Sequence, residues 1–122
     1  MVVRTLALAA ATAGILLAAS ASAQDGAAVR VAHDALASGD YARAERVLAA
    51  EQRIFPGSPE VLVNLAAVYA RTGRVQQAAA LYRNVLLRED VLLDLSADRA
   101  VSSHVLAETG LHRIGTLQTA AR

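Results

Sequence analysis

The chain contains few side chains of the kinds that catalyse reactions or bind metals. Histidine occurs at His33, His104 and His112, and cysteine is absent. His104 and His112 are separated by about 12 Å along a helix, which is too far for two ligands of one metal ion. The lack of cysteine excludes disulfides, thiolate nucleophiles and cysteine-ligated zinc or iron–sulfur centres. We expect surface or cap histidines, with no bound metal or cofactor.

Two other patterns resemble chemical motifs only superficially. Asp90, Asp94 and Asp98 recur at every fourth position, but a calcium loop needs closely alternating oxygen ligands and a glycine at its bend. The run Ser102–His104 is not a catalytic triad, because triad members converge from separate parts of a fold beside an oxyanion hole. No nucleophile elbow is present either. These residues predict solvated carboxylates and a helix cap, and we expect a protein that is not an enzyme.

Length and composition predict one small helical domain. The chain has 122 residues, of which 55% are hydrophobic but only 3% aromatic, and alanine accounts for most of the difference. Alanine favours helices because it loses no side-chain entropy in them. The 12 basic residues are all arginine and stand against 11 acidic ones. This balance argues against nucleic-acid binding, which relies on a strong positive field.

Residues 1–23 have the pattern of a secretory signal peptide. Arg4 precedes an uncharged stretch, and Ala21 and Ala23 fit the small-residue rule for cleavage before Gln24. The apolar run of about 14 residues is shorter than the ~20 that a membrane-spanning helix needs. We therefore predict a periplasmic or secreted bacterial protein with no stable membrane insertion after cleavage. An uncleaved membrane anchor is the alternative.

A repeat follows the signal sequence. Residues 25–58 align with residues 59–92 at an offset of 34 without a gap, and each unit is predicted to form two helices joined by a turn. The matched pairs are Val31 with Leu65, Ala32 with Ala66, Gly39 with Gly73, Ala44 with Ala78, and Leu48 with Tyr82.

Turn and cap residues mark the ends of the predicted helices. Gly39 suits the left-handed conformation that closes a helix, and Asp40 can cap the next one. Pro56 ends the second helix, whereas Pro59 fits the first position of the third, after Ser58 as its cap. The predicted apolar stripes of the four helices comprise Val29, Ala32 and Leu36; Ala44, Val47, Leu48 and Ile54; Leu62, Leu65, Ala66 and Tyr69; and Ala78, Leu81, Tyr82 and Val85.

This pattern resembles the tetratricopeptide repeat, a 34-residue helix–turn–helix unit that stacks into a superhelix. The resemblance rests on Val31, Ala32, Gly39, Asp40, Tyr41, Ala44 and Pro56 in the first unit, and on Leu65, Ala66, Tyr69, Gly73, Ala78 and Tyr82 in the second. It implies an all-α fold with two such repeats stacked as a short solenoid. A generic pair of alanine-rich helical hairpins is the alternative.

The sequence departs from the family pattern at five positions. Ala28 and Leu62 replace the early aromatic residue, and Glu51 and Val85 replace a small residue late in the second helix. Asp90 stands where the closing proline is usual. The second unit is therefore the better match in its first helix, and the first unit has the better terminal turn.

The resemblance also implies a peptide-binding groove along the first helix of each unit. Asn64 could bond a peptide backbone amide, and Arg30 and Arg71 could each hold a carboxylate in a bidentate geometry. Ala67, however, replaces the second asparagine of the family's carboxylate clamp, and the clamp's lysine is missing. The groove positions carried over from the family are Arg30, His33, Val63, Asn64, Ala67 and Arg71.

Residues 93–122 are expected to cap the apolar end of the repeats. We predict an extended or turn-rich connection over 90–98, then a short helix from Ser103 to about Leu111, with Gly110 weakening it and 116–122 frayed. Val105, Leu106 and Ile114 are its expected packing positions. The alternative for the connection is a strand pair over 91–95 and 99–101, with Asp98 in the turn.

These inferences favour a non-enzymatic periplasmic interaction module. It would bind a peptide segment of a protein partner or act as an adaptor in the cell envelope. Because two repeats are fewer than the three or so that a stable stack usually needs, a self-assembling homo-oligomer without a peptide ligand is the alternative.

Overall fold

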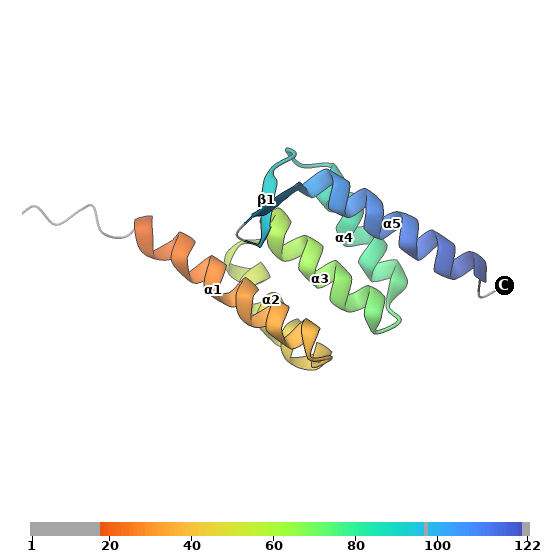
Figure 1. Cartoon of the computed structure of the whole chain (residues 1–122), viewed down its shortest axis with the longest axis horizontal. Coiled ribbons are helices and arrows are strands. Elements are labelled where there is room, and N and C mark those ends of the chain that lie inside the picture. The colour runs from red at the N-terminus through yellow and green to blue at the C-terminus, as the bar shows by residue number, and fades with distance from the viewer. Residues whose placement is uncertain (1–17, 97, 121–122) are drawn as a thin grey trace, which may run out of the picture.

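The computed structural model describes residues 18–96 and 98–120 as helices with one small hairpin (Figure 1). The predicted all-α class, with two stacked helical hairpins and a C-terminal helix, is confirmed. Residues 1–17 of the predicted signal peptide lie outside the described part. The elements are α1 (Ala18–Ala37), α2 (Tyr41–Ile54), α3 (Pro59–Arg71), α4 (Val75–Leu86), β1 (Leu92–Ser96), β2 (Arg99–Ser102) and α5 (Ser103–Ala120).

The turns inside the two repeats have the same geometry. Gly39 and Gly73 adopt φ angles of 79° and 81°, in the left-handed region where a side chain would be strained. The amide of Asp40 donates to the carbonyl of Ala35 at 2.8 Å, and that of Arg74 donates to Tyr69 at 2.8 Å. These are the bonds of a Schellman motif, which satisfies the last carbonyls of a helix. The two turns, 34 residues apart, therefore have nearly the same φ angle and the same type of hydrogen bond.

Side-chain caps define two of the helix starts. The Asp40 carboxylate accepts a hydrogen bond from the amide of Arg43 at 3.1 Å, and the Ser58 hydroxyl accepts one from Val61 at 3.4 Å. Pro59 lies at the start of α3, where its missing N–H costs nothing. All three residues have the roles that the sequence predicts.

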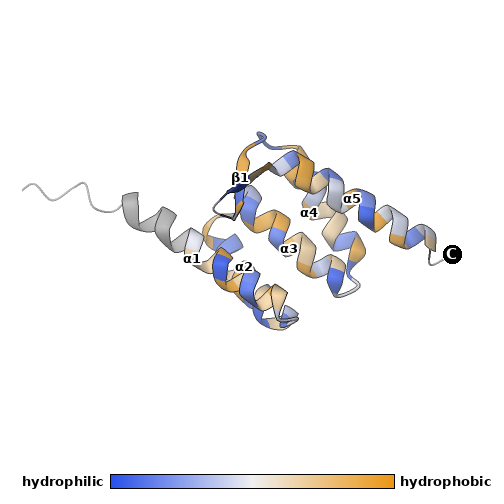
Figure 2. Cartoon of the chain, in the orientation of Figure 1, coloured by the Kyte–Doolittle hydropathy of each residue, from blue (hydrophilic) through white to orange (hydrophobic). Residues whose placement is uncertain are grey.

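The core consists of two clusters that share α3. Val61, Leu65 and Val68 of α3 pack with α1 and α2, while Leu62 and Ala66 pack with α4 and α5. Along the coloured parts of the helices, hydrophobic and hydrophilic residues accordingly follow one another (Figure 2). The two clusters comprise Val29, Ala32, Ala35, Ala44, Leu48, Val61, Leu65 and Val68, and then Leu62, Ala66, Ala78, Ala79, Tyr82, Val85, Ala107 and Ile114.

Two expected packing positions, Ile54 and Val105, are solvent-exposed. Val105 is 51% exposed, so its assignment to the packing face of α5 is wrong. Ile54 is 65% exposed, so its assignment to the apolar stripe of α2 is wrong, because it is the last residue of that helix. Val31 is 36% exposed although its repeat partner Leu65 is buried. Leu65 packs against the preceding repeat, and the described chain places no repeat before α1 for Val31 to contact.

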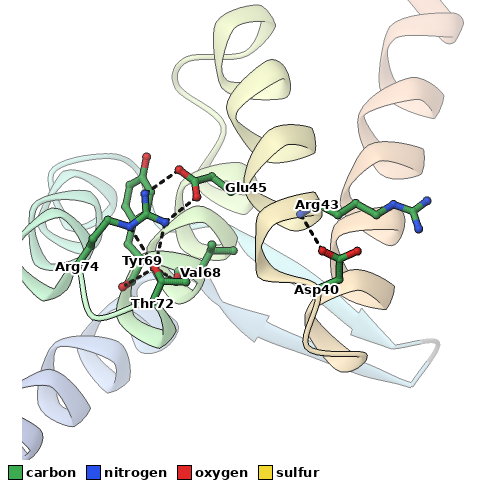
Figure 3. A network of polar contacts seen from close by, with 7 residues as sticks. All are labelled: Asp40, Arg43, Glu45, Val68, Tyr69, Thr72 and Arg74. Atoms are coloured by element: carbon green, nitrogen blue, oxygen red, sulfur yellow. Dashed lines mark hydrogen bonds and ion pairs between the residues drawn. The ribbon is translucent and has the colours of Figure 1, made fainter.

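An ion pair joins the first repeat to the turn of the second (Figure 3). The Arg74 guanidinium donates to both carboxylate oxygens of Glu45, at 2.7 and 2.6 Å, and also to the hydroxyl of Thr72. Its charged centre lies 4.5 Å from the ring centroid of Tyr69. The bidentate contact lowers the pKa of Glu45 and raises that of Arg74. It therefore links α2 to the turn before α4.

The connection between α4 and α5 forms the strand pair that the sequence analysis keeps as its alternative. Leu92 pairs with Ser102, and Leu93 with Val101, in an antiparallel register that shifts between Asp94 and Ser96. Leu93 is buried, whereas Leu92 is 74% exposed. Leu92 and Leu93 thus face the solvent and the protein, as successive residues of a strand do.

The C-terminal helix is longer than the sequence predicts. The expected end near Leu111 and the frayed tail are wrong up to Ala120, since α5 continues to that residue. Ile114 is 4% exposed in the second core cluster, so packing extends the helix past Gly110. Among the described residues, no helix has the length and apolar character needed to cross a membrane.

Candidate functional site

The helices α1, α3 and α5 lie side by side and run in roughly the same direction (Figure 1). The surface that they form together with the hairpin contains two hollows. Helix α3 and the hairpin contribute residues to both. This surface corresponds to the one on which the sequence analysis expects a peptide groove.

The first hollow lies between α1, the start of α3 and β1, and has a volume of about 520 Å³. We call it the α1–hairpin hollow. It contains Arg30 and His33 from the predicted groove set, together with acidic residues of α3 and β1. Its lining residues are Gly26, Val29, Arg30, His33, Glu60, Asp94 and Leu95.

The second hollow lies between α3 and α5, with β2 at one end, and has a volume of about 490 Å³. We call it the α3–α5 groove. It contains Val63, Ala67 and Arg71 from the predicted set. The complete lining is Val63, Ala67, Ala70, Arg71, Tyr82, Arg99, Val101, Val105, Leu106, Thr109, Gly110, Arg113, Ile114 and Leu117.

Asn64, the sixth predicted residue, bonds to neighbouring protein groups. His33 Nε2 and Asn64 Oδ1 are 2.8 Å apart, which links α1 to α3. The Asn64 side-chain amide donates to the backbone carbonyl of Glu60 at 2.8 Å. One donor and one acceptor site of the amide remain for a ligand. The structure thus brings His33 and Asn64 together, but it places Arg30 and Arg71 in different hollows.

The α3–α5 groove combines an apolar floor with three exposed guanidinium groups. Arg71 comes from α3, Arg99 from β2 and Arg113 from α5. Burial raises the pKa of the Tyr82 hydroxyl, and the positive charges of Arg113 and Arg71 oppose that rise. Tyr82 therefore stays neutral at physiological pH, and the groove carries a net positive charge.

Two of these arginines are missing from the sequence-based set. Arg99 belongs to the hairpin, which the resemblance does not include, and Arg113 lies beyond the predicted end of the last helix. One signal in the sequence points to Arg113, because Leu106, Gly110 and Arg113 recur at helical spacing along one face. The predicted helix, weakened at Gly110 and ending near Leu111, leaves Arg113 outside it.

Gly110 is required by close packing rather than by backbone conformation. A Cβ atom at this position would lie 2.3 Å from the Tyr82 ring, far inside van der Waals contact. Because Gly110 has no side chain, α5 can pack closely against Tyr82 of α4. This packing sets the position of α5, which forms one wall of the groove. The sequence predicts only that Gly110 weakens the helix, and this close packing on Tyr82 is not part of that prediction.

The residues around Ser102 form a helix-start cluster instead of a catalytic site. The Ser102 hydroxyl accepts from the amide of Val105 at 3.2 Å, as the predicted cap does. Asp90 accepts hydrogen bonds from the hydroxyls of Ser102 and Ser103 and from the amide of His104. His104 Nε2 lies 2.7 Å from the carbonyl oxygen of Arg88, away from the serine hydroxyls. In the described ranges, no group of histidine and acidic residues could hold a metal ion.

These hydrogen bonds make one contribution to stability depend on pH. The bonds from Ser102 and His104 lower the pKa of Asp90, so the carboxylate stabilises the fold above its unfolded pKa of about 3.9. We expect Asp90→Asn to lower the unfolding midpoint in urea at pH 7. The difference from wild type should shrink as the pH falls through the lowered pKa of the folded state.

The matched control is Asp98→Asn, at an exposed position in the hairpin turn. It should leave the unfolding midpoint in urea unchanged at pH 7 and at pH 2. An Asp90→Asn deficit that stays constant from pH 7 down to pH 2 would contradict this assignment.

A comparison with protein-family models supports the helical repeat predicted from the sequence. The family model of the tetratricopeptide repeat matches residues 35–91, which run from the end of α1 through α4 to the start of the hairpin. No curated protein and no solved structure matches the chain. The matched segment contains both Schellman turns and the ion pair between the repeats. Over residues 35–91, the chain is therefore similar to the tetratricopeptide-repeat family.

Proposed function

We propose that this protein is a binding module that holds a segment of a partner protein in the α3–α5 groove. Tetratricopeptide repeats are in general non-enzymatic protein-interaction units. The observation that supports the proposal is the groove itself, an apolar hollow of about 490 Å³ with arginines from three elements around it. Apolar hollows with a few converging polar groups are the usual binding sites of proteins.

Affinity capture from the cells that naturally produce the protein tests this proposal. The tagged full-length chain is expressed beside the double variant Arg71→Glu/Arg113→Glu, in which two guanidinium groups of the groove become carboxylates. We expect the wild type to retain a specific partner and the variant to lose it. The control Arg43→Glu/Arg83→Glu changes the same number of charges at exposed positions of α2 and α4 and should retain the partner. Equal retention by all three proteins would contradict the proposal.

We also propose that the protein works outside the cytoplasm, in the periplasm or after secretion, as an adaptor in the envelope. The support is the charge, length and small-residue pattern of residues 1–23. N-terminal sequencing of the protein from fractionated cells should find Gln24 as the first residue, in the envelope or medium fraction. A cytoplasmic protein that retains Met1 would contradict this localisation.

A further inference from the structure

The α3–α5 groove concentrates positive charge in a protein whose charges nearly balance. The chain has 12 basic and 11 acidic residues, yet the lining of the groove contains three arginines and no carboxylate. Within residues 26–95 and 98–120, none of these guanidinium groups forms an ion pair with an acidic side chain. Three like charges around one hollow repel one another, and a bound carboxylate would relieve that repulsion.

Apolar side chains remain exposed beside these charges. Val105 and Leu117 both line the groove and are 51% and 60% exposed. The floor between them includes Leu106 and Ile114 of α5 and Val63 of α3. Covering such side chains is favourable in proportion to the apolar area removed from water. The ligand that fits this lining therefore carries apolar and acidic groups together.

The walls of the groove favour a helical ligand over an extended one. Helices α3 and α5 use their backbone groups internally, so the long walls offer no ladder of donors and acceptors to an extended chain. An extended segment would leave its own amides and carbonyls unpaired against the apolar floor, whereas a helix satisfies them itself. From Val105 to Leu117 the wall runs about 18 Å, the length of roughly 12 helical residues.

We propose that the α3–α5 groove binds an amphipathic helix of a partner protein, with apolar side chains on the floor and glutamate or aspartate on its flanks. This inference rests on the proposed function and adds the chemistry of the ligand. Arginine pairs well with carboxylates because its planar fork donates two parallel hydrogen bonds. Arg99 and Arg113 lie outside the matched repeat segment 35–91. The hairpin and α5 thus add two of the three arginines that favour acidic ligands.

Four designed, fluorescein-labelled peptides of equal length test the proposal. The first is an amphipathic helix with leucine along one stripe and glutamate on both flanks. The second and third replace every glutamate with glutamine or lysine, and the fourth keeps the acidic composition but contains prolines that prevent a helix. Fluorescence anisotropy measures the affinity of each peptide for the protein. The protein is purified from the cells that naturally produce it.

We expect the glutamate helix to bind at least about tenfold more tightly than the glutamine helix, the factor expected from one charge-assisted hydrogen bond. The lysine helix should not bind. Raising the ionic strength from about 0.1 M to about 1 M, which shortens the Debye length from about 10 Å to 3 Å, should remove most of the glutamate helix's advantage.

Single variants assign this preference to named side chains. Arg99→Gln and Arg113→Gln should each reduce the affinity for the glutamate helix by about tenfold, with little change for the glutamine helix. Arg83→Gln, at an exposed position of α4 outside the groove, is the control and should bind as the wild type does. Circular dichroism of each variant establishes that it is folded before binding is compared.

Two results would overturn the inference and leave the proposed function standing. Equal binding of the glutamate and glutamine helices would mean that the groove does not select charge. Tighter binding of the proline-containing peptide would mean that the ligand is extended. If none of the peptides binds, the inference is wrong, and the proposed function depends on the capture experiment alone.

Discussion

Replacing Leu65 with alanine is expected to lower the free energy of unfolding by about 2–5 kcal/mol, the usual range for a buried leucine. Leu65 is 1% exposed and lies in the cluster that joins α3 to the first repeat. The substitution removes a buried isobutyl group and leaves a cavity where the two repeats meet. In a domain of this size, such a loss is a large share of the total stability.

The matched control for Leu65→Ala is Leu87→Ala. Leu87 is 88% exposed just after α4, so its truncation should change the stability by no more than about 0.5 kcal/mol. Urea unfolding followed by circular dichroism measures both variants. A Leu65→Ala protein as stable as the control would show that α3 does not pack between the repeats as described.

Replacing Gly110 with alanine is the second large effect, and its sign is opposite to that expected from helix propensity. Alanine in a helix is normally about 1 kcal/mol more favourable than glycine. At Gly110, however, the added Cβ atom would lie 2.3 Å from the Tyr82 ring, and that ring is only 6% exposed. The ring and α5 must therefore move apart, and we expect a net loss of about 1–3 kcal/mol, typical of an overpacked core.

Gly115 provides a control in the same helix. A Cβ atom there meets nothing within 4 Å, so Gly115→Ala should stabilise the protein by up to about 1 kcal/mol. The loss of stability caused by Gly110→Ala should also be smaller in a protein that already carries Tyr82→Ala. Substitutions at residues in contact are not additive. If both glycine variants gain stability equally in thermal unfolding, α5 does not lie on Tyr82.

The repeat could be predicted from the sequence because each of its determinants is local. Gly39 and Gly73 favour the left-handed turn through their own backbone freedom, and Asp40 and Ser58 cap helices that begin at the next residue. The 34-residue offset then repeats these signals in register. No long-range contact is needed to recognise either helical hairpin.

The C-terminal part could not be predicted in full because its determinants are tertiary. Gly110 lowers the local helix propensity, yet packing of Ile114 and the fit of Tyr82 against Gly110 extend α5 past it. Arg99 reaches the groove only because the hairpin folds beside α5. The three arginines therefore come from elements whose arrangement no single segment of the sequence specifies.

The predicted groove residues likewise separate into those placed by one helix and those that depend on the tertiary arrangement. Val63, Ala67 and Arg71 line one hollow together because they share a face of α3. Arg30 and His33 were predicted to line the same groove as these residues, but they face a separate hollow beside β1. The family pattern does not include the hairpin, which contributes residues to both hollows.

The central claim is that the partner occupies the α3–α5 groove, and site-specific photo-crosslinking in the producing cells tests it most directly. A photoreactive residue is placed in the full-length chain at Val105 or Leu117, on the rim of the groove, or at Gln76, an exposed position of α4 outside it. We expect a crosslink to a different protein from both rim positions and none from Gln76. A crosslink from Gln76 alone, or rim crosslinks only to a second copy of the chain, would contradict the claim.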